Sequence, residues 1–306
     1  MKSGSEQTNE LTSSAPLWIA SRSLLAKHGA EFFSRWIKVA QGYQEDDVHD
    51  LRVASRRLRE GLFLFAGCFP DKQRQRLAKK VKKVTRMLGD LRNIDEEVRY
   101  FAGLDGEDNS PFRQELQELL TALRRDREEV HKKLEEEFSA LDPHPLQKDF
   151  HTISEGGNLF VAPHTDPFIG IASFAGEAIC ERADTVRELL PGARQEQASV
   201  AQHQLRIAVK KLRYRLELLA PLFGEPYQDL HRTLKEYQDL LGKLHDTDVF
   251  ADLVQRRVPN GAGSKALLGV LAKRRATLFQ EFTQQLQRAP LASLGDRARE
   301  SLPQNR

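Results

Sequence analysis

Two segments of the sequence begin with a histidine and continue with closely spaced arginine and lysine residues. The first contains His49, Arg52, Arg56 and Arg59, and the second contains His203, Arg206, Lys210 and Arg213. On a helix that advances about 100° per residue, each set falls on one face, opposite a face of leucine and alanine. Cations at these spacings repel one another unless an anion lies between them. The spacing therefore predicts two anion-binding helix faces.

A third cationic face follows the first segment. It consists of Lys79, Lys82, Lys83 and Arg86, opposite an apolar face within residues 77–88. Residues 49–92 hold 13 Lys and Arg against four Asp and Glu, so they carry +9 in a chain whose formal net charge is only +3. Such a local excess favours a polyanionic partner. A solvated helix surface is the alternative, but such surfaces normally mix both signs of charge, and acids are missing from these three faces.

His49 and His203 hold equivalent positions at the start of their segments, which indicates a functional role for both. Neither helix offers a second His or a Glu one turn away on the same face, and the neighbouring cations would oppose a divalent ion. We therefore predict no metal site and no cofactor, and we interpret both histidines as donors to an anion.

Two further features have structural interpretations. The element Leu-Gly-x-Leu-x-x-x-Asp ends at Asp95 and again at Asp248, and it predicts a tight turn between two helices with the aspartate as N-cap. Arg127 and Arg275 interrupt apolar helix stripes and leave two alternatives open. They form salt bridges inside the helical bundles, or they form a second wall of the anion site.

Long helices are needed to position these residues, and helix-forming residue types dominate the stretches between prolines and glycines. We predict an all-α fold with helices over residues 17–41, 45–67, 71–89, 94–103, 112–141, 168–190, 197–220, 226–243, 248–257 and 264–288. Residues 49–59 align with 203–213 at an offset of 154, and 88–95 align with 241–248 at an offset of 153. These matches predict an internal duplication that forms two bundles related by a pseudo-twofold axis.

The expected division of the chain has five parts. They are a disordered N-terminal tail over 1–15, a first helical repeat over 16–141, a linker over 142–167, a second repeat over 168–290 and a C-terminal tail over 291–306. Four prolines and two adjacent glycines within 142–167 carry the linker prediction.

The composition narrows the class of protein. The chain has 306 residues, of which 40% are hydrophobic and 30% charged, and no apolar stretch is long enough to span a membrane. Cys68 and Cys180 are too few for a disulfide framework, so we interpret both as core residues. These features favour a globular cytoplasmic protein.

The repeated motifs resemble those of the CHAD family. The resemblance rests on His-x-x-Arg-Val-x-x-Arg-Arg-Leu-Arg and Leu-Gly-x-x-Arg-Asn-x-Asp in the first half, and on His-x-x-Arg-Ile-x-x-Lys-Lys-Leu-Arg-Tyr and Leu-Gly-x-x-x-Asp-x-Asp in the second. It implies two four-helix bundles around a central basic groove or pore that binds inorganic polyphosphate, often at polyphosphate granules. It adds Arg57, Lys211 and Tyr214 to the candidate ligand residues named above.

The sequence departs from this symmetric pattern in one respect. Glu236 and Asp239 stand in the second half where the first half has Lys83 and Arg86, so we expect that wall to contribute less to binding. Relatives in this family are often joined to a triphosphate tunnel domain, whose Glu-x-Glu-x-Lys motif is missing from this sequence. We therefore expect a stand-alone module.

Three other functions are alternatives to polyphosphate binding. Nucleic acid is the second candidate ligand, but only Phe63 and Tyr214 lie near the basic faces to stack on bases. A phosphate-processing enzyme would need a metal cluster or a nucleophile beside a base, and no such motif is present. A scaffold that binds protein partners through the acidic helix 112–141 has no specific support. We therefore predict a binding protein with no catalytic residues.

Overall fold

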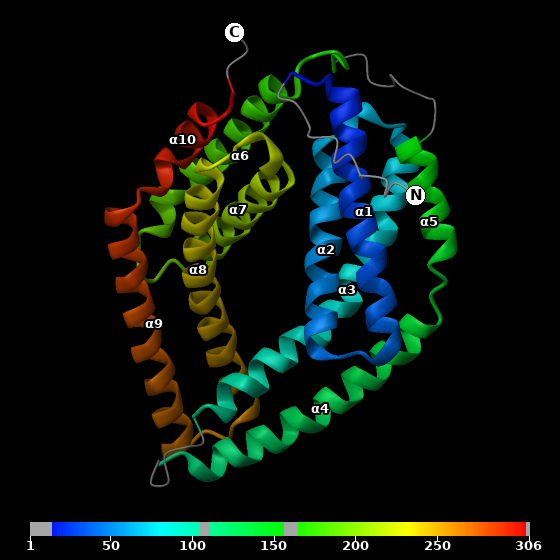
Figure 1. The fold of residues 1–306 in the computed structure, drawn as a ribbon. Coiled ribbons are helices and arrows are strands. Elements are labelled where there is room, and N and C mark those ends of the chain that lie inside the picture. Colours follow the sequence, from blue (N-terminus) through cyan, green and yellow to red (C-terminus); the bar gives the residue numbers. More distant parts are fainter. Residues whose placement is uncertain (1–13, 105–110, 156–164, 304–306) are drawn as a thin grey trace, which may run out of the picture.

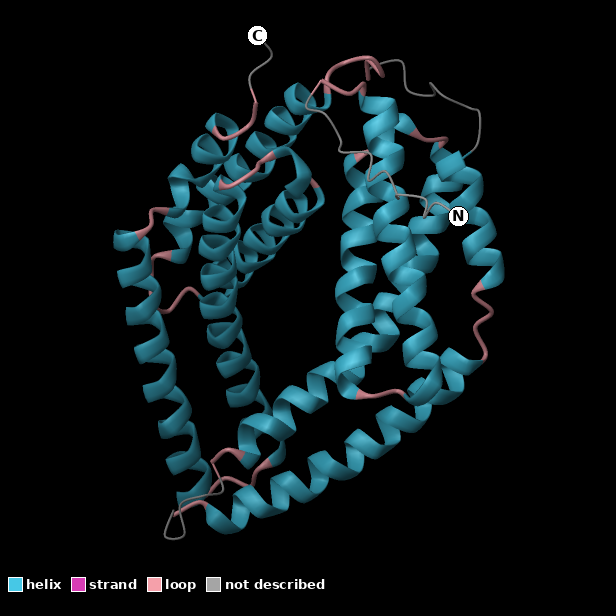
Figure 2. Cartoon of the chain, viewed as in Figure 1, coloured by secondary structure: helices cyan, strands magenta, loops and turns pink. Residues whose placement is uncertain are grey.

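The computed structural model of the chain describes residues 14–104, 111–155 and 165–303. These residues form ten α-helices and three short 3-10 helices, and none of them forms a β-strand (Figures 1 and 2). The predicted all-α class is therefore confirmed for the described part of the chain. Residues 1–13, which make up most of the predicted disordered tail, lie outside it.

The first half of the chain supplies five α-helices. They are α1 (Leu17–Gly42), α2 (Glu45–Leu64), α3 (Asp71–Ala102), α4 (Arg113–Ser139) and α5 (His144–Glu155). Helix α2 packs against both α1 and α3, α4 runs along α3, and α5 contacts α1 and α3. Helices α1, α2 and α3 stand side by side on the right in Figure 1.

The second half is built in the same order. Its helices are α6 (Ile171–Ala193), α7 (Ser199–Leu218), α8 (Pro226–Arg257), α9 (Ala262–Arg288) and α10 (Leu294–Glu300). Helix α7 packs against α6 and α8, α9 runs along α8, and α10 contacts α6 and α8. Helices α2 and α7 have 20 residues each, α3 and α8 have 32, and α4 and α9 have 27.

The amphipathic pattern of α2 explains its place at the centre of the molecule. Leu51, Leu58 and Leu62 lie on one stripe and are fully buried, whereas the arginines of the opposite face are only half-buried. Three acidic residues in the first turn of α2 favour the positive end of its helix dipole. Because α2 contacts α7 directly, the cationic faces of the two halves meet.

Two apolar cores hold the helices together. The larger one extends through the helices of both halves. The smaller one joins the far ends of α3, α4, α8 and α9, where the rings of Tyr100 and Phe250 stack with centroids 4.4 Å apart. The halves are therefore connected at the α2–α7 contact and again at this far end, which lies at the bottom of Figure 1.

Two predicted helix breaks were wrong. Helices α3 and α8 continue without interruption through Gly89 and Gly242, so Asp95 and Asp248 lie within helices and are not N-caps. A glycine in a helix interior costs only about 1 kcal/mol relative to alanine, and the packing of these long helices outweighs that cost.

Two segments predicted as irregular contain helices. The predicted linker 142–167 includes α5, which buries Leu146 and Phe150 against the first half. The predicted C-terminal tail 291–306 includes a 3-10 turn and α10, whose Leu294 and Ala298 are buried. Both helices are short, so their apolar residues form too brief a pattern to stand out in the sequence.

Candidate anion-binding site

The contact between α2 and α7 gathers four cations, which we call the central cluster: Arg52, Arg56, Arg206 and Lys210. Burial, followed by the charges of Arg56 and Arg206, lowers the pKa of Lys210 to about 7. Burial and the charge of Arg56 also lower the pKa of Arg52 to about 10. The Nε atoms of Arg52 and Arg206 are buried and make no hydrogen bond to any described residue. No cation of the cluster forms an ion pair with a described residue, although the charge of Asp246 partly offsets the fall in the pKa of Arg206.

The repeated Leu-Gly elements help to position this cluster. An added Cβ at Gly89 of α3 would lie 3.9 Å from Nη2 of Arg52, and one at Gly242 of α8 would lie 3.8 Å from Nε of Arg206. Each arginine thus extends over a glycine of the neighbouring helix. Any side chain longer than that of alanine would compete with the guanidinium for this space.

One side of the cluster opens into a cavity of about 680 Å³, which we call the lysine pocket. Its cationic lining residues are Arg56, Arg59, Arg74, Lys79, Lys82, Arg182, Lys210 and Lys211, contributed by α2, α3, α6 and α7. Six of these, namely Arg56, Arg59, Lys79, Lys82, Lys210 and Lys211, make no ion pair within the described chain, whereas Arg74 pairs with Asp71 and Arg182 with Glu60. The one carboxylate in the lining, Glu60, pairs with the buried Arg215 at 2.9 Å.

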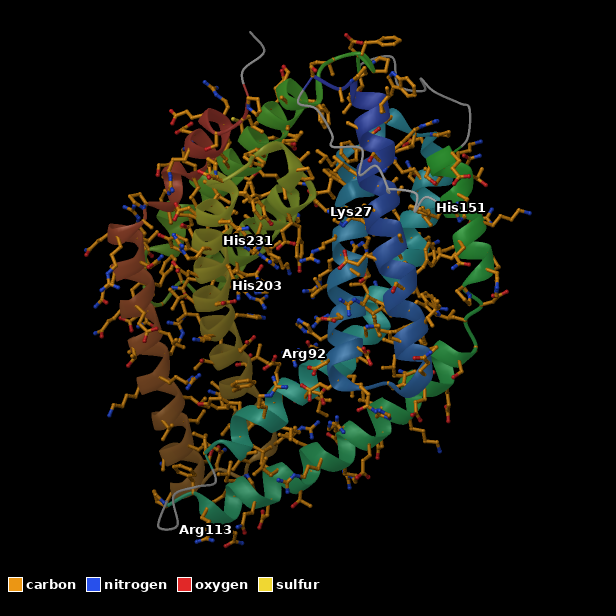
Figure 3. All side chains as sticks on the ribbon, in the orientation of Figure 1. Lys27, Arg92, Arg113, His151, His203 and His231 are labelled. Carbon is orange, nitrogen blue, oxygen red and sulfur yellow. The ribbon has the colours of Figure 1, made fainter. Side chains whose placement is uncertain are left out.

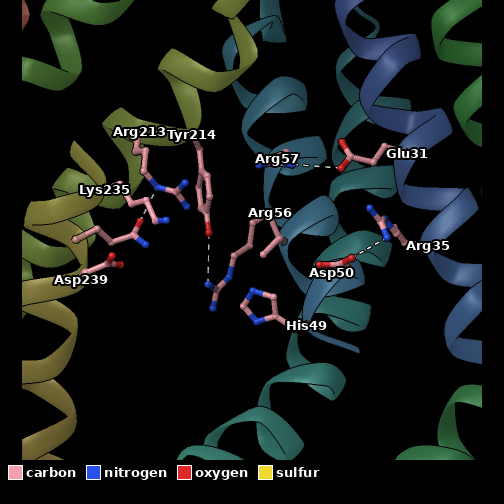
Figure 4. A pocket seen from close by; sticks show the side chains of 12 residues that line it. Glu31, Arg35, His49, Asp50, Arg56, Arg57, Arg213, Tyr214, Lys235 and Asp239 are labelled. Atoms are coloured by element: carbon pink, nitrogen blue, oxygen red, sulfur yellow. Dashed lines mark hydrogen bonds and ion pairs between the residues drawn. The ribbon is translucent and has the colours of Figure 1, made fainter. Parts of the chain in front are cut away.

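The other side opens into a cavity of about 420 Å³, which we call the carboxylate pocket (Figure 4). Its charged lining residues are Glu31, Arg35, His49, Asp50, Arg56, Arg57, Arg213, Lys235 and Asp239. Here cations have acidic partners. Arg35 pairs with Asp50 at 2.7 Å, and Arg57 pairs with Glu31 at 3.2 Å.

Arg56 and Tyr214 line both pockets and form the boundary between them. Nη1 of Arg56 donates a hydrogen bond of 3.5 Å to the Tyr214 hydroxyl, which connects α2 to α7 (Figure 4). The ring of Tyr214 is buried, so its hydroxyl is the part of this side chain that reaches the pockets.

The two predicted histidines lie in different surroundings. His49 lines the carboxylate pocket, where partial burial and the charge of Arg92 lower its pKa. Nδ1 of His203 lies 3.0 Å from Nδ1 of His245, so one of the two nitrogens carries the shared hydrogen. Burial and the charge of Arg206 lower the pKa of His245 to about 4. His203 and Arg92 both project toward the region between the halves (Figure 3).

The structure gives Arg127 and Arg275 partners inside the helix packing. Arg127 donates to Asp95 at 2.6 Å, and Arg275 donates to Asp248 at 2.6 Å. The contacts that these arginines make are the salt bridges of the first alternative. Neither arginine lines either of the two pockets. Lys83 and Arg86 are exposed on α3 and also lie outside both linings.

Sequence reasoning missed several contributors to the site, among them Arg182, Glu217 and His245. Arg182 of α6 enters the lysine pocket with its guanidinium 4.8 Å from the ring centroid of Phe63, and no basic pattern surrounds it in the sequence. Glu217 of α7 accepts hydrogen bonds from Arg57 and Arg213. His245 could have been found, because it aligns with Arg92 in the repeated Leu-Gly element.

The described residues provide neither a metal-binding cluster nor a membrane-spanning helix. They contain no group of three or more His, Cys, Asp or Glu side chains arranged to hold a metal ion. No helix among them combines the length and apolar character that crossing a membrane requires.

Comparison with known proteins gives a family and a fold. The CHAD domain family matches residues 23–255. The crystal structure of the CHAD domain from the plant Ricinus communis superimposes with a TM-score of 0.64 at 22% identity, covering 100% of this chain and 98% of that one. PptA from Streptomyces chartreusis superimposes with a TM-score of 0.63 at 16% identity, covering 89% and 100% respectively. No curated protein matches this chain.

Proposed function

Because this chain belongs to the CHAD domain family, we propose that it binds inorganic polyphosphate through cations of both halves. The observation that carries this proposal is the central cluster, in which Arg52, Arg56, Arg206 and Lys210 lie together and form no ion pair with a described residue. Keeping like charges together in a partly buried place is unfavourable unless an anion binds there. The cluster is therefore best explained as a binding site.

Polyphosphate suits these residues chemically. It carries about one negative charge per phosphate, and arginine can donate two parallel hydrogen bonds to a pair of phosphate oxygens. Lysines supply additional charge without a fixed geometry. The ligand chain would lie over the central cluster beside Tyr214.

The finer architecture is part of the same proposal. We attribute the matched helix lengths to an internal duplication, and we treat the central cluster and the lysine pocket as parts of one basic groove between the halves. The equivalent pairs Arg127–Asp95 and Arg275–Asp248 support the duplication, because both connect the third and fourth helices of their half. In a cell, binding of this kind would recruit the chain to polyphosphate granules.

We propose binding without catalysis, and we place nucleic acid second. Phe63 is 54% exposed beside the lysine pocket, but the guanidinium of Arg182 lies over its ring. Tyr214 is buried and presents its hydroxyl, not its ring face. Base stacking therefore has little support, whereas contacts to a phosphate backbone have many donors.

The proposal is tested by titrating the protein with polyphosphate of defined length and with duplex DNA of equal charge at the same salt concentration. We expect tighter binding of polyphosphate, because a groove lined from two sides suits a thin chain better than a duplex about 20 Å wide. Equal affinities for the two polymers would contradict a polyphosphate site.

Two double variants test whether both halves contribute. Arg52→Ala/Arg56→Ala and Arg206→Ala/Lys210→Ala should each weaken polyphosphate binding by about tenfold or more, because each removes two charged donors. The matched control is Lys265→Ala/Lys273→Ala, which removes two exposed lysines of α9. If only one central pair matters while helical circular dichroism stays native, the site belongs to one half.

A further inference from the structure

The lysine pocket and the carboxylate pocket occupy equivalent places in the two halves. The lysine pocket is lined by α2, α3, α6 and α7, and the carboxylate pocket by α7, α8, α1 and α2. At the sequence offsets of 154 and 153, Arg59 corresponds to Arg213 and Lys82 corresponds to Lys235. Each of these four residues lines the pocket of its own half. The two pockets thus share two pairs of equivalent cations.

The difference between the pockets arises one helical turn after the arginine. Arg59 is followed four residues later by Phe63, and Arg213 is followed four residues later by Glu217. Arg59 makes no ion pair among the described residues, while Arg213 pairs with Glu217. A spacing of four residues places the two side chains on the same face of a helix, so this one position determines whether the arginine is neutralised.

Glu217 neutralises more than its own neighbour. Its side chain is 5% exposed, and it accepts hydrogen bonds from Nε of Arg57 at 2.7 Å, from Arg213, and from Nε2 of His231 at 2.9 Å. Burial alone would raise the pKa of Glu217, but the charges of Arg213 and Arg57 hold it below its usual value. Glu217 is therefore an anion at neutral pH, and it occupies the donors that a phosphate would need.

Other carboxylates, in the lining of the carboxylate pocket, also offset the positive charge of its cations. Glu31 also pairs with Arg57, Asp50 pairs with Arg35, and Asp239 adds an exposed negative charge to the lining. In the lysine pocket the single carboxylate, Glu60, is itself held by Arg215. An anion in the carboxylate pocket would have to displace several internal ion pairs, whereas the lysine pocket offers free cations.

We propose that Glu217 closes the carboxylate pocket to polyanions, so that polyphosphate binds on one side only, in the lysine pocket and over the central cluster. This inference rests on the proposed polyphosphate binding. It makes Glu217 the residue that determines on which side of the central cluster the polyphosphate binds. The consequence is an asymmetric site within a nearly symmetric fold. A polyphosphate chain on this site contacts α3 and not α8.

The first test compares two equivalent lysines. Lys82→Gln and Lys235→Gln each remove one exposed charge, so they change the net charge of the protein equally. At about 0.15 M salt, where distant charges are screened, Lys82→Gln should weaken polyphosphate binding about fivefold and lower the slope of log affinity against log salt by about one. Lys235→Gln should change affinity less than about twofold. Equal losses would overturn the one-sided site.

The second test opens the closed pocket. Glu217→Gln keeps the size of the side chain and removes the charge that holds Arg57 and Arg213, so polyphosphate should bind more tightly and with a steeper salt dependence. A residue with only a structural role would lower affinity or leave it unchanged when substituted. A folded variant, verified by circular dichroism, with no gain in affinity would contradict the assignment to Glu217.

These tests separate the inference from the function on which it rests. If Glu217→Gln does not fold, Asp239→Asn removes an exposed charge from the lining of the carboxylate pocket and should also raise affinity, and the lysine pair still decides which side binds. If the unmodified protein binds no polyphosphate, the proposed function fails. If it binds and the two lysine variants lose affinity equally, only the one-sided site fails.

Discussion

Lys210 should make polyphosphate binding depend on pH. In the free protein its pKa is about 7, because burial and the charges of Arg56, Arg206 and Arg52 disfavour its ammonium form. At that pKa about nine in ten molecules carry the charge at pH 6 and about one in ten at pH 8. A bound polyanion stabilises the ammonium, so the complex takes up a proton wherever Lys210 was neutral.

The direction of the effect follows from this proton uptake. The pKa of Lys210 is lowered in the free protein and rises on binding, so the complex holds more protons than the free protein above about pH 7. Affinity should therefore be nearly constant below that pH and fall above it. From pH 6 to pH 8 the contribution of Lys210 amounts to about a tenfold loss of affinity.

Isothermal titration calorimetry in buffers of different ionisation enthalpy measures the uptake directly. At pH 7.5 we expect about 0.8 proton per binding event from Lys210, with long polyphosphate chains used so that their terminal phosphates contribute little. The control is Lys210→Arg, which retains the positive charge and does not titrate in this range. The reasoning is refuted if Lys210→Arg binds with the same pH dependence and the same proton uptake as the unmodified protein.

Three further outcomes are expected. In His49→Gln/His203→Gln the rise in polyphosphate affinity from pH 8 to pH 6 should be smaller than in the unmodified protein. Both imidazoles have lowered pKa values in the free protein, and a bound polyanion favours their protonation. An unchanged dependence of affinity on pH would show that both histidines have a structural role. Arg215→Leu should lower the free energy of unfolding by about 3 kcal/mol in urea, because it leaves Glu60 buried without its main partner. Gly295→Ala should lower the melting temperature without changing polyphosphate affinity, because the new Cβ would lie 2.3 Å from a side-chain atom of α6, and full stability would show that α10 can shift.

The helical faces were predictable from the sequence because they depend only on local spacing. Arg52, Arg56 and Arg59 recur at intervals of three and four residues opposite a leucine stripe, and this pattern alone places them on one side of α2. The same periodicity located α7 and the all-α class. The short helices α5 and α10 were missed because their stability comes from packing against longer helices and not from their own pattern.

The repeated Leu-Gly element shows how tertiary contacts override a local signal. A glycine followed six residues later by an aspartate resembles the end of one helix and the start of the next. Helices α3 and α8 nevertheless continue through Gly89 and Gly242, because both helices pack along their whole length. The function of the element becomes visible only in space, where each glycine lies beside an arginine from the preceding helix. Asp95 likewise accepts a hydrogen bond from Arg127, which lies 32 residues away in the sequence.

The sequence by itself determined which residues are cationic and which face of each helix they occupy. The tertiary structure decided which of those cations remain free for a ligand. Arg57 and Arg59 belong to the same motif, but Glu217, 160 residues from Arg57, neutralises only the former. Because Coulomb interactions depend on distance in space, the pairing of charges on different helices follows from helix packing and cannot be read from spacing along one helix.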